Sequence, residues 1–256
     1  MIFLREKNMN PIRLDRGVQF GIGVFETIAV LNHKAVFLPF HLDRLENGMR
    51  TLGIENPEYD REALMEKMRD IEKLFDKTAV KIMATEENLI VKLRKIPYER
   101  EDYEKGFSIC FSDVLRNETS PMTYLKSMNS ADLILEKEKA KKRGFDEPIF
   151  LNTQGAVTEG AVTNLFCVKN GKIRTPAVSG GLLNGAVRHH LLSVFPEIKE
   201  TVLTREDLCS ADEIFLTNSL MGVMPVAALE NRPMISRETG DRLCRYYFNR
   251  ILNEPY

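Results

Sequence analysis

The chain has 256 residues, 43% of them hydrophobic and 29% charged, a balance typical of a globular protein with a substantial core. The 36 Lys and Arg residues nearly cancel the 37 Asp and Glu residues, so a net charge of −1 gives no reason to expect a nucleic acid partner. No apolar run approaches the roughly 20 residues of a membrane-spanning helix, and charged residues closely follow the short apolar start. We therefore expect a cytoplasmic protein without a membrane partner.

Cysteine and histidine spacing argues against a metal centre and against a disulfide framework. His189 and His190 are adjacent, and on a helix adjacent side chains point about 100° apart, so they cannot share one metal ion as residues four apart can. The four cysteines form no CxxC pair. They are widely separated: Cys110, Cys167, Cys209 and Cys244.

Local patterns in the first part of the chain predict helices and strands. An apolar stripe follows Pro39 and ends near Gly53, and its members recur at three- and four-residue steps, as one face of a helix requires. A second stripe of this kind begins after Asp60. The strands predicted here are 79–84 and 89–94, which form a hairpin, and 107–112.

A polar segment divides the chain into two expected domains. Residues 116–123 contain Asn, Thr, Ser and Pro with little apolar content, which favours a linker between a small lobe at 1–115 and a larger lobe at 124–256. Mixed helices and strands indicate an α/β (α+β) fold. The elements predicted in the larger lobe are a helix from about 131 to Gly144, a hairpin around Asn170-Gly171, a helix from about 186, a strand at 214–217 and an amphipathic helix at 237–252.

Three features could carry chemistry, and each also has an ordinary structural explanation. Residues 180–192 form a glycine-rich turn before a helix whose first amides can bind anions, although a glycine there is often only a turn residue. Lys126 lies between the linker and a helix, where a cleft could form, but most lysines are solvated surface groups. Glu159 interrupts a strand-like stretch, where a buried carboxylate needs a partner and an exposed edge residue does not.

Six segments, in this order and over nearly the whole chain, carry a family resemblance. They are FGIGVFETI at 20–28, HLDRL at 41–45, LKSMN at 125–129, VTEGAVTNLF at 157–166, LNGAVR at 183–188 and ADEIFLTNSLMGVMPV at 211–226. Together they resemble the fold-type IV pyridoxal-phosphate enzymes, the class IV aminotransferase family. This family includes branched-chain and D-amino-acid aminotransferases and 4-amino-4-deoxychorismate lyase.

The resemblance implies the cofactor pyridoxal 5'-phosphate and a residue for each of its groups. Lys126 is similar to the Schiff-base lysine, which holds the cofactor aldehyde and then moves the Cα proton of the substrate. Glu159 is similar to the carboxylate that keeps the pyridine nitrogen protonated, so that the ring accepts electrons. Arg44 resembles the phosphate-binding arginine, and the amides of Ala186 and Val187 would add donors.

The same resemblance implies positions for further residues and for the fold. Leu183 would lie against the cofactor ring with Thr163 and Asn164 close beside it, whereas Ser219 and Leu220 would form a turn that touches the phosphate or the substrate carboxylate. It also implies a two-lobed fold, with a small N-terminal α/β lobe, a larger C-terminal lobe with a β-barrel-like sheet and the cofactor between them. A homodimer would complete the pocket.

Some segments look more like the lyase than like the aminotransferases of the family. These are FGIG at 20–23 and NSLMGVMPV at 218–226. Ser130 and Ala131 stand where branched-chain enzymes place a tyrosine near the cofactor oxygen, which argues against that specificity. Other positions argue against the lyase. Phe25-Glu26-Thr27 replaces the FTT of some lyases, Ala29 stands where many members have Arg or another large residue, and Glu86-Glu87 stands where Arg-Gly is frequent. Val187 also lacks the hydroxyl of a common threonine.

We therefore expect a pyridoxal-phosphate enzyme that acts on a small-molecule amino substrate. The favoured activity is that of 4-amino-4-deoxychorismate lyase, which releases pyruvate and gives 4-aminobenzoate for folate synthesis. The alternatives are an aminotransferase of the D-amino-acid or broad branched-chain type and, more remotely, a family member that binds a ligand without turnover. Arg94, Arg116 or a residue of a partner chain could clamp the substrate carboxylate, and the sequence does not choose among them.

Overall fold

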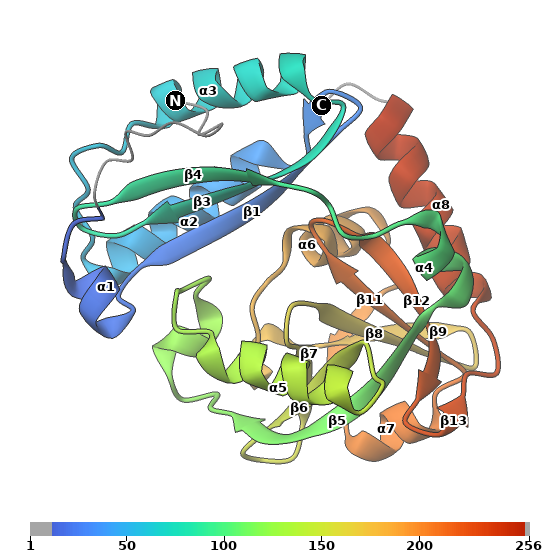
Figure 1. The fold of residues 1–256 in the computed structure, drawn as a ribbon. Helices are drawn as coiled ribbons and strands as arrows, with labels where there is room; N and C mark the ends of the chain where they lie inside the picture. The colour runs from blue at the N-terminus through green and yellow to red at the C-terminus, as the bar shows by residue number, and fades with distance from the viewer. Residues whose placement is uncertain (1–11, 254–256) are drawn as a thin grey trace. The chain divides into compact units, whose positions relative to one another are not determined.

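The structure, a computed structural model, describes residues 12–253, which form two compact units. Unit 1 comprises the described residues up to Pro97 together with Leu125–Ser130. Unit 2 comprises Tyr98–Tyr124 and the described residues from Ala131 onward. Both units mix helices with strands, which confirms the expected α/β (α+β) class (Figure 1).

Unit 1 is built on a four-stranded antiparallel sheet with the strand order β2-β1-β3-β4 (Figure 1). Side chains that point to one face, such as Ile28 and Val80, form a core with apolar residues of the two longer helices. The elements are α1 (Arg16–Phe20), β1 (Val24–Leu31), β2 (Lys34–Ala35), α2 (Leu38–Leu52), α3 (Arg61–Leu74), β3 (Lys77–Ala84) and β4 (Leu89–Arg94).

The helices and the hairpin predicted for this part of the chain are confirmed. α2 ends before Gly53, whose φ of 64° is the left-handed conformation that closes many helices. α3 begins after Asp60, whose carboxylate accepts a hydrogen bond from the Ala63 N–H at 2.8 Å. The hairpin is present as β3 and β4. Local sequence therefore specifies most of unit 1.

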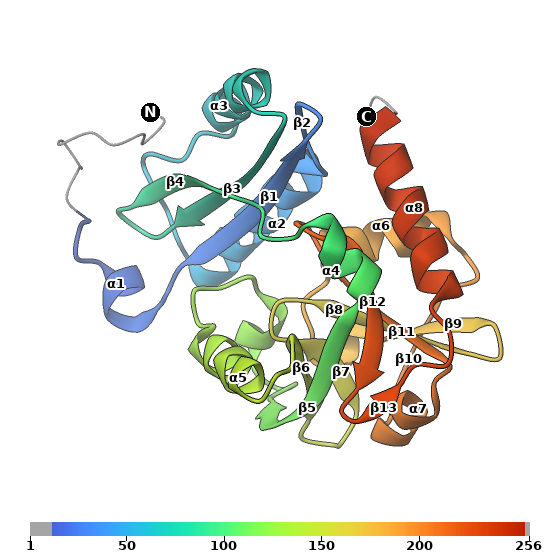
Figure 2. The ribbon, with the colours of Figure 1, turned by 45° about the vertical axis from the view of Figure 1, so that its right-hand side comes forward.

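Unit 2 is built on a nine-stranded sheet with the order β10-β9-β8-β11-β12-β5-β6-β7, and β13 pairs with β12. β7, at one end of this order, lies against β8, so the sheet curls like part of a barrel (Figure 2). The elements are α4 (Arg100–Lys105), β5 (Phe107–Arg116), η1 (Pro121–Tyr124), α5 (Ala131–Lys142), β6 (Glu147–Asn152), β7 (Val157–Gly160), β8 (Asn164–Lys169), β9 (Lys172–Pro176), η2 (Val178–Gly180), α6 (Ala186–Val194), β10 (Lys199–Thr201), α7 (Arg205–Ser210), β11 (Glu213–Asn218), β12 (Gly222–Leu229), β13 (Arg232–Pro233) and α8 (Glu238–Asn253).

The elements predicted for this part of the chain are present, and β5 is longer than expected. Asn170 and Gly171 have φ angles of 50° and 72°, as the tight turn between β8 and β9 requires. β5 continues past residue 112, because its pairing with β6 shifts register after Phe111 and resumes at Leu115 and Arg116. Among the described helices, none is both long and apolar enough to cross a lipid bilayer.

Candidate active site

Lys126 lies in a short segment of unit 1 that pairs with the start of β1. The Phe25 N–H donates to the Lys126 carbonyl at 2.9 Å, and the Met128 N–H donates to the Gly23 carbonyl at 2.8 Å. The Lys126 side-chain nitrogen lies 4.6 Å from the centre of the Phe25 ring. The backbone pairing therefore fixes the position from which this amine can act as a nucleophile or a base.

Glu26 lies on the opposite face of β1 from Phe25 and is fully buried against α2. Arg44 donates from Nε to Glu26 Oε1 at 2.6 Å and from Nη2 to Oε2 at 2.8 Å, while His41 Nδ1 lies 2.6 Å from Oε2. Because an ionised carboxylate only accepts, Nδ1 of His41 carries the hydrogen. The two-pronged pair with Glu26 fixes the plane of the Arg44 guanidinium.

Burial and charge together set the protonation states of this cluster. Burial alone raises the pKa of Glu26, but the charge of Arg44, the neighbouring His41 and the hydrogen bonds from both outweigh it and lower the pKa to about 2. Burial lowers the pKa of His41; Glu26 opposes this, and the positive charges of Arg44 and Lys126 reinforce it. At neutral pH the cluster therefore holds an ionised Glu26 and a neutral His41.

The lowered pKa of His41 predicts a pH-dependent stability. Below pH 6.5, the ordinary value, histidine takes up a proton in the unfolded chain while folded His41 stays neutral, so the free energy of unfolding falls as the pH falls. One such group contributes a slope of up to about 1.4 kcal/mol per pH unit. Urea unfolding between pH 7 and pH 5.5 should show a smaller slope in His41→Gln than in the wild type. The slope should not vanish, because burial also lowers the pKa of His190.

The matched control for this measurement is His33→Gln, since His33 is exposed and its ring bonds only a backbone carbonyl among its described hydrogen bonds. This control should keep the wild-type slope. A wild-type slope in His41→Gln as well would contradict the assignment of a neutral, buried His41.

The face of the unit 1 sheet that carries Phe25 also carries three cations. Lys81 is paired with Thr27 of β1 and with Lys92 of β4, and Arg94 lies on the same face two residues from Lys92. Lys81 Nζ lies 4.5 Å from the centre of the Phe25 ring. Burial and the charges of Arg94 and Lys92 lower the pKa of Lys81. Within residues 12–253 no carboxylate forms an ion pair with any of these three side chains, so the face favours an anionic ligand.

Glu159 is buried in β7 of unit 2, at 6% exposure, and is not an exposed edge or turn residue. Its Oε1 accepts a hydrogen bond from Arg116 Nη2 at 3.3 Å, and its Oε2 accepts one from the Leu183 N–H at 3.1 Å. A guanidinium and a backbone donor are the kind of partners that a buried carboxylate needs to stay ionised.

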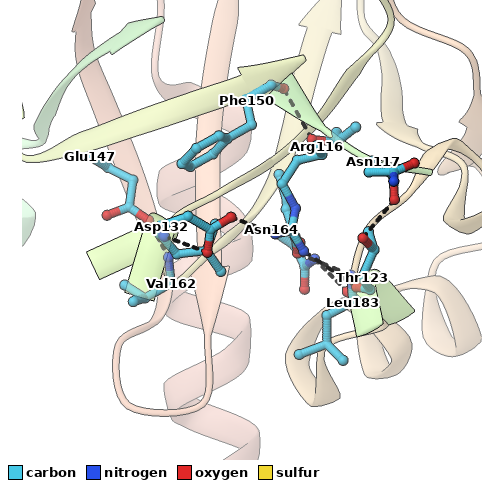
Figure 3. A network of polar contacts seen from close by, with 12 residues as sticks. Arg116, Asn117, Thr123, Asp132, Glu147, Phe150, Val162, Asn164 and Leu183 are labelled. Atoms are coloured by element: carbon cyan, nitrogen blue, oxygen red, sulfur yellow. Dashed lines mark hydrogen bonds and ion pairs between the residues drawn. The ribbon is translucent and has the colours of Figure 1, made fainter. Parts of the chain in front are cut away.

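Leu183 and Asn164 form the next part of the same network (Figure 3). The Asn164 side chain donates to the Leu183 carbonyl at 2.7 Å and accepts from the Gly185 N–H at 3.1 Å. A side chain at Gly185 would collide with Asn164, which explains the glycine. Gly185 precedes α6, so Asn164 fixes the start of the helix, where the amides of Ala186 and Val187 have no partner within the helix.

Thr163 is held by a second buried carboxylate. Glu147 of β6 is fully buried, and its Oε1 accepts from the Val162 N–H at 2.7 Å (Figure 3). The same oxygen accepts from the Thr163 hydroxyl at 3.0 Å. Lys137 of α5 donates to its Oε2 at 2.6 Å. A side chain at Gly160 would lie 2.6 Å from Glu147 Oε1, so this turn requires glycine. The arrangement fixes Thr163 at the start of β8.

Ser219 and Leu220 lie in the turn between β11 and β12. The Leu220 N–H donates to the side-chain oxygen of Asn218 at 2.9 Å, which shapes this turn. Thr217 of β11 lies directly opposite Asn164 of β8, so the two side chains share a face of the sheet. The Thr217 hydroxyl is fully buried and has no hydrogen-bond partner among the residues described. It is therefore able to bond a group that enters from that face.

Within unit 2, hydrogen bonds join Glu159 and Asn164 to Leu183, and the expected site residues are divided between the two units. Lys126 and Arg44 belong to unit 1, where the charge of Lys126 lowers the pKa of His41 in the cluster that holds Arg44. The others belong to unit 2: Glu159, Thr163, Asn164, Leu183, Ala186, Val187, Ser219 and Leu220. Glu26, His41 and Glu147 are not among the site residues expected from the sequence. The sequence VFETIAVL does not alternate apolar with polar residues, so it gives no signal that Glu26 faces inward, as the burial pattern of β1 shows.

Comparisons with known proteins agree with these observations. The family model for amino-transferase class IV matches residues 23–229. The chain is 28% identical to a putative branched-chain-amino-acid aminotransferase of Methanocaldococcus jannaschii, over 93% of this chain and 89% of that protein. It is 27% identical to the aminodeoxychorismate lyase of Bacillus subtilis, over 89% of this chain and 84% of that protein.

Among solved structures, a putative 4-amino-4-deoxychorismate lyase from Legionella pneumophila superposes with a TM-score of 0.83 at 27% identity, covering 95% of this chain and 96% of that one. The fold is thus that of the fold-type IV enzymes, as expected. Pyridoxal phosphate is the cofactor of this class, and a PLP-bound form is found among the fold neighbours. Because the family model matches most of this chain, the chain belongs to the class IV aminotransferases, a family of pyridoxal-phosphate enzymes.

Proposed function

We propose that this enzyme is a 4-amino-4-deoxychorismate lyase, which releases pyruvate and gives 4-aminobenzoate for folate synthesis. The observation that carries the proposal is the cationic face around Phe25. Lys126 and Lys81 both lie over this ring, so their amines are within about 9 Å of each other. Aminodeoxychorismate has two carboxylates besides its amine. A cationic face next to the reacting lysine, without an ion-pair partner among the described residues, suits such a dianion.

Within each unit, the residues present have the chemistry that the cofactor requires. Pyridoxal phosphate supplies an aldehyde that condenses with amines and a ring that accepts the electrons released at the substrate carbon. In this proposal Lys126 provides the amine, and buried Glu159 provides the carboxylate for the ring nitrogen. Arg44, held in place by Glu26, binds phosphate oxygens, as do the first amides of α6. Contacts with the ring and the phosphate are assigned to Thr163, Asn164, Leu183, Ser219 and Leu220.

The proposed chemistry uses Lys126 twice. Its neutral amine removes the proton from the carbon that bears the substrate amine. The C–O bond to the enolpyruvyl group then breaks, and Lys126 returns a proton to the departing enolpyruvate, which becomes pyruvate. Loss of this group makes the substrate ring aromatic, and 4-aminobenzoate remains. Glu159 meanwhile holds the proton at the ring nitrogen of the cofactor, which keeps the ring electron-poor.

The experiment that tests this proposal is an absorbance scan of the purified protein with pyridoxal phosphate, followed by substrate addition. Aminodeoxychorismate should release pyruvate rapidly while the visible band of the bound cofactor persists. A protein that cannot be loaded with pyridoxal phosphate would contradict the cofactor assignments to these residues. A loaded protein that releases no pyruvate would contradict the lyase.

An aminotransferase is the second candidate, and the similarity to the Methanocaldococcus jannaschii protein favours it. The same cofactor residues serve both reactions, so only the substrate separates them. Conversion of the cofactor to its pyridoxamine form by D- or L-amino acids, without pyruvate from aminodeoxychorismate, would establish this activity. Persistence of the cofactor without any turnover would instead indicate the remote alternative, a ligand-binding member. The homodimer and the cytoplasmic location remain predictions, and sedimentation of the loaded protein tests the former.

The cationic face predicts an effect on substrate affinity. Lys81→Met should raise the KM for aminodeoxychorismate by about tenfold or more, since a charge-assisted bond to a carboxylate is lost, and should change kcat less. Steady-state pyruvate release measures both constants. Lys73→Met is the matched control, because Lys73 lies on α3 with its side chain 74% exposed and pairs only with Asp70 among its described ion pairs. An unchanged KM in Lys81→Met would show that no carboxylate binds there.

A further inference from the structure

Arg116 ends β5 in unit 2, and its side chain faces the interior at 9% exposure. Its Nη2 lies 3.3 Å from Glu159 Oε1 and 3.5 Å from the Thr123 carbonyl. Its Nη1 lies 3.7 Å from Asp132 Oδ2, a half-exposed carboxylate at the start of α5. Figure 3 shows Arg116 with Thr123, Asp132 and Leu183 in one network. Arg116 therefore has two carboxylate neighbours within its own unit, whereas Lys81, Lys92 and Arg94 of the Phe25 face form no ion pair within residues 12–253.

Glu159 is anchored at both oxygens by this arrangement. Arg116 donates to Oε1, and the Leu183 N–H donates to Oε2. Each carboxylate oxygen has two lone pairs, so a further N–H can be accepted without loss of either bond. Because the two donors come from β5 and from the loop before α6, they fix the rotation of the carboxylate as well as its position.

The pair of Arg116 and Glu159 also favours the charged form of Glu159. A buried carboxylate without a cation favours its protonated form, because the charged form loses its hydration. A guanidinium stays charged under all conditions in which proteins are folded, so it stabilises the carboxylate form of Glu159 permanently. A protonated ring nitrogen needs such an anion as its acceptor. A neutral carboxylic acid would offer a hydrogen to that nitrogen and would not draw a proton to it.

We propose that Arg116 is a positioning residue that holds Glu159 as an oriented anion and thereby keeps the ring nitrogen of the cofactor protonated. This inference rests on the proposed cofactor role of Glu159. It assigns Arg116 to the electronic control of the cofactor and removes it from the residues that could clamp the substrate carboxylate.

A merely structural role is the alternative, because Arg116 also joins β5 to η1 through the Thr123 carbonyl. The two roles differ in their dependence on the ring nitrogen. If Arg116 keeps Glu159 ionised, replacement of Arg116 should weaken the binding only of ligands that present a ring nitrogen. If Arg116 only supports the fold, its loss should weaken all cofactor analogues equally.

The test compares the Kd of pyridoxal phosphate with the Kd of its 1-deaza analogue, in which a C–H group replaces the ring nitrogen. Fluorescence titration of the cofactor-free protein measures both, and condensation with Lys126 cancels in the ratio because both ligands are aldehydes. The wild type should prefer pyridoxal phosphate by at least about tenfold, as a charge-assisted hydrogen bond predicts. Arg116→Met should reduce this preference at least about fivefold, and Glu159→Gln should do the same.

Asp132→Asn is the matched control, since it removes the other carboxylate near Arg116 without a change at Glu159. It should keep the wild-type preference. If Arg116→Met fails to fold, as judged by circular dichroism and thermal unfolding, Arg116→Gln gives the same comparison, because it keeps a donor but no charge.

Three outcomes would overturn the inference, and they can be told apart. A full preference in Arg116→Met, with both affinities lowered equally, would show a structural role only and would leave the proposed function intact. A wild type that binds both ligands equally would remove the role of Glu159 at the ring nitrogen and the role of Arg116 with it. A wild type that binds neither ligand would overturn the proposed cofactor residues themselves.

Discussion

Lys126→Ala is expected to lose the visible absorbance of the bound cofactor and at least about 10³-fold of the turnover rate. The expectation follows from the position of the amine, which the backbone pairing between Lys126 and Phe25 fixes over an aromatic ring. Alanine removes both the group that condenses with the cofactor and the group that moves the proton. Because the Lys126 backbone bonds do not depend on its side chain, the variant should fold.

The measurement combines an absorbance scan with pyruvate release under single-turnover conditions. Lys126→Arg is the matched variant, because it keeps a positive charge but has no amine that can lose a proton at neutral pH. It should be as inactive as Lys126→Ala, and thermal unfolding should show both variants folded. Retention of the cofactor band and of activity in either variant would mean that another residue performs this role.

The parts of the fold that follow from short-range sequence could be predicted, because their causes are local. The apolar stripe of α2, the Asp60 cap of α3 and the Asn170-Gly171 turn each involve residues within a few positions of one another. The family motifs also identify Lys126 and Glu159 as candidate site residues, because a motif is a set of residue types in a fixed order along the chain.

The polar networks could not be predicted in this way, because their partners are far apart in sequence. Arg116 and Glu159 are separated by 43 positions, and Arg44 and Glu26 by 18. The polar composition after residue 115 indicates a linker, but Arg116 is the last residue of β5. Its backbone pairs with Asn152 of β6, and this pairing does not depend on the side chains. Which cation meets which buried carboxylate depends on strand order and register, and these follow from packing over the whole unit.

Glu159→Gln tests the part of the site that depends on such a network. Glutamine has nearly the same shape and can still accept the Leu183 N–H, so the variant should fold and bind the cofactor. It has no charge, so it cannot favour a proton on the ring nitrogen, and the ring becomes a poorer acceptor of electrons. Proton removal from the substrate should therefore slow by about 10²-fold or more.

Stopped-flow absorbance of the loaded protein measures this step directly, before product release can limit the rate. Glu118→Gln is the matched control, because Glu118 is a surface carboxylate of unit 2 that bonds Thr153, and its replacement should leave the rate unchanged. A deuterium label on the transferred hydrogen of the substrate should slow the Glu159→Gln reaction, because proton removal would then limit it. A wild-type rate in Glu159→Gln would mean that the ring accepts electrons without a protonated nitrogen. In that case the buried pair of Arg116 and Glu159 would only link side chains of β5 and β7, the two strands on either side of β6.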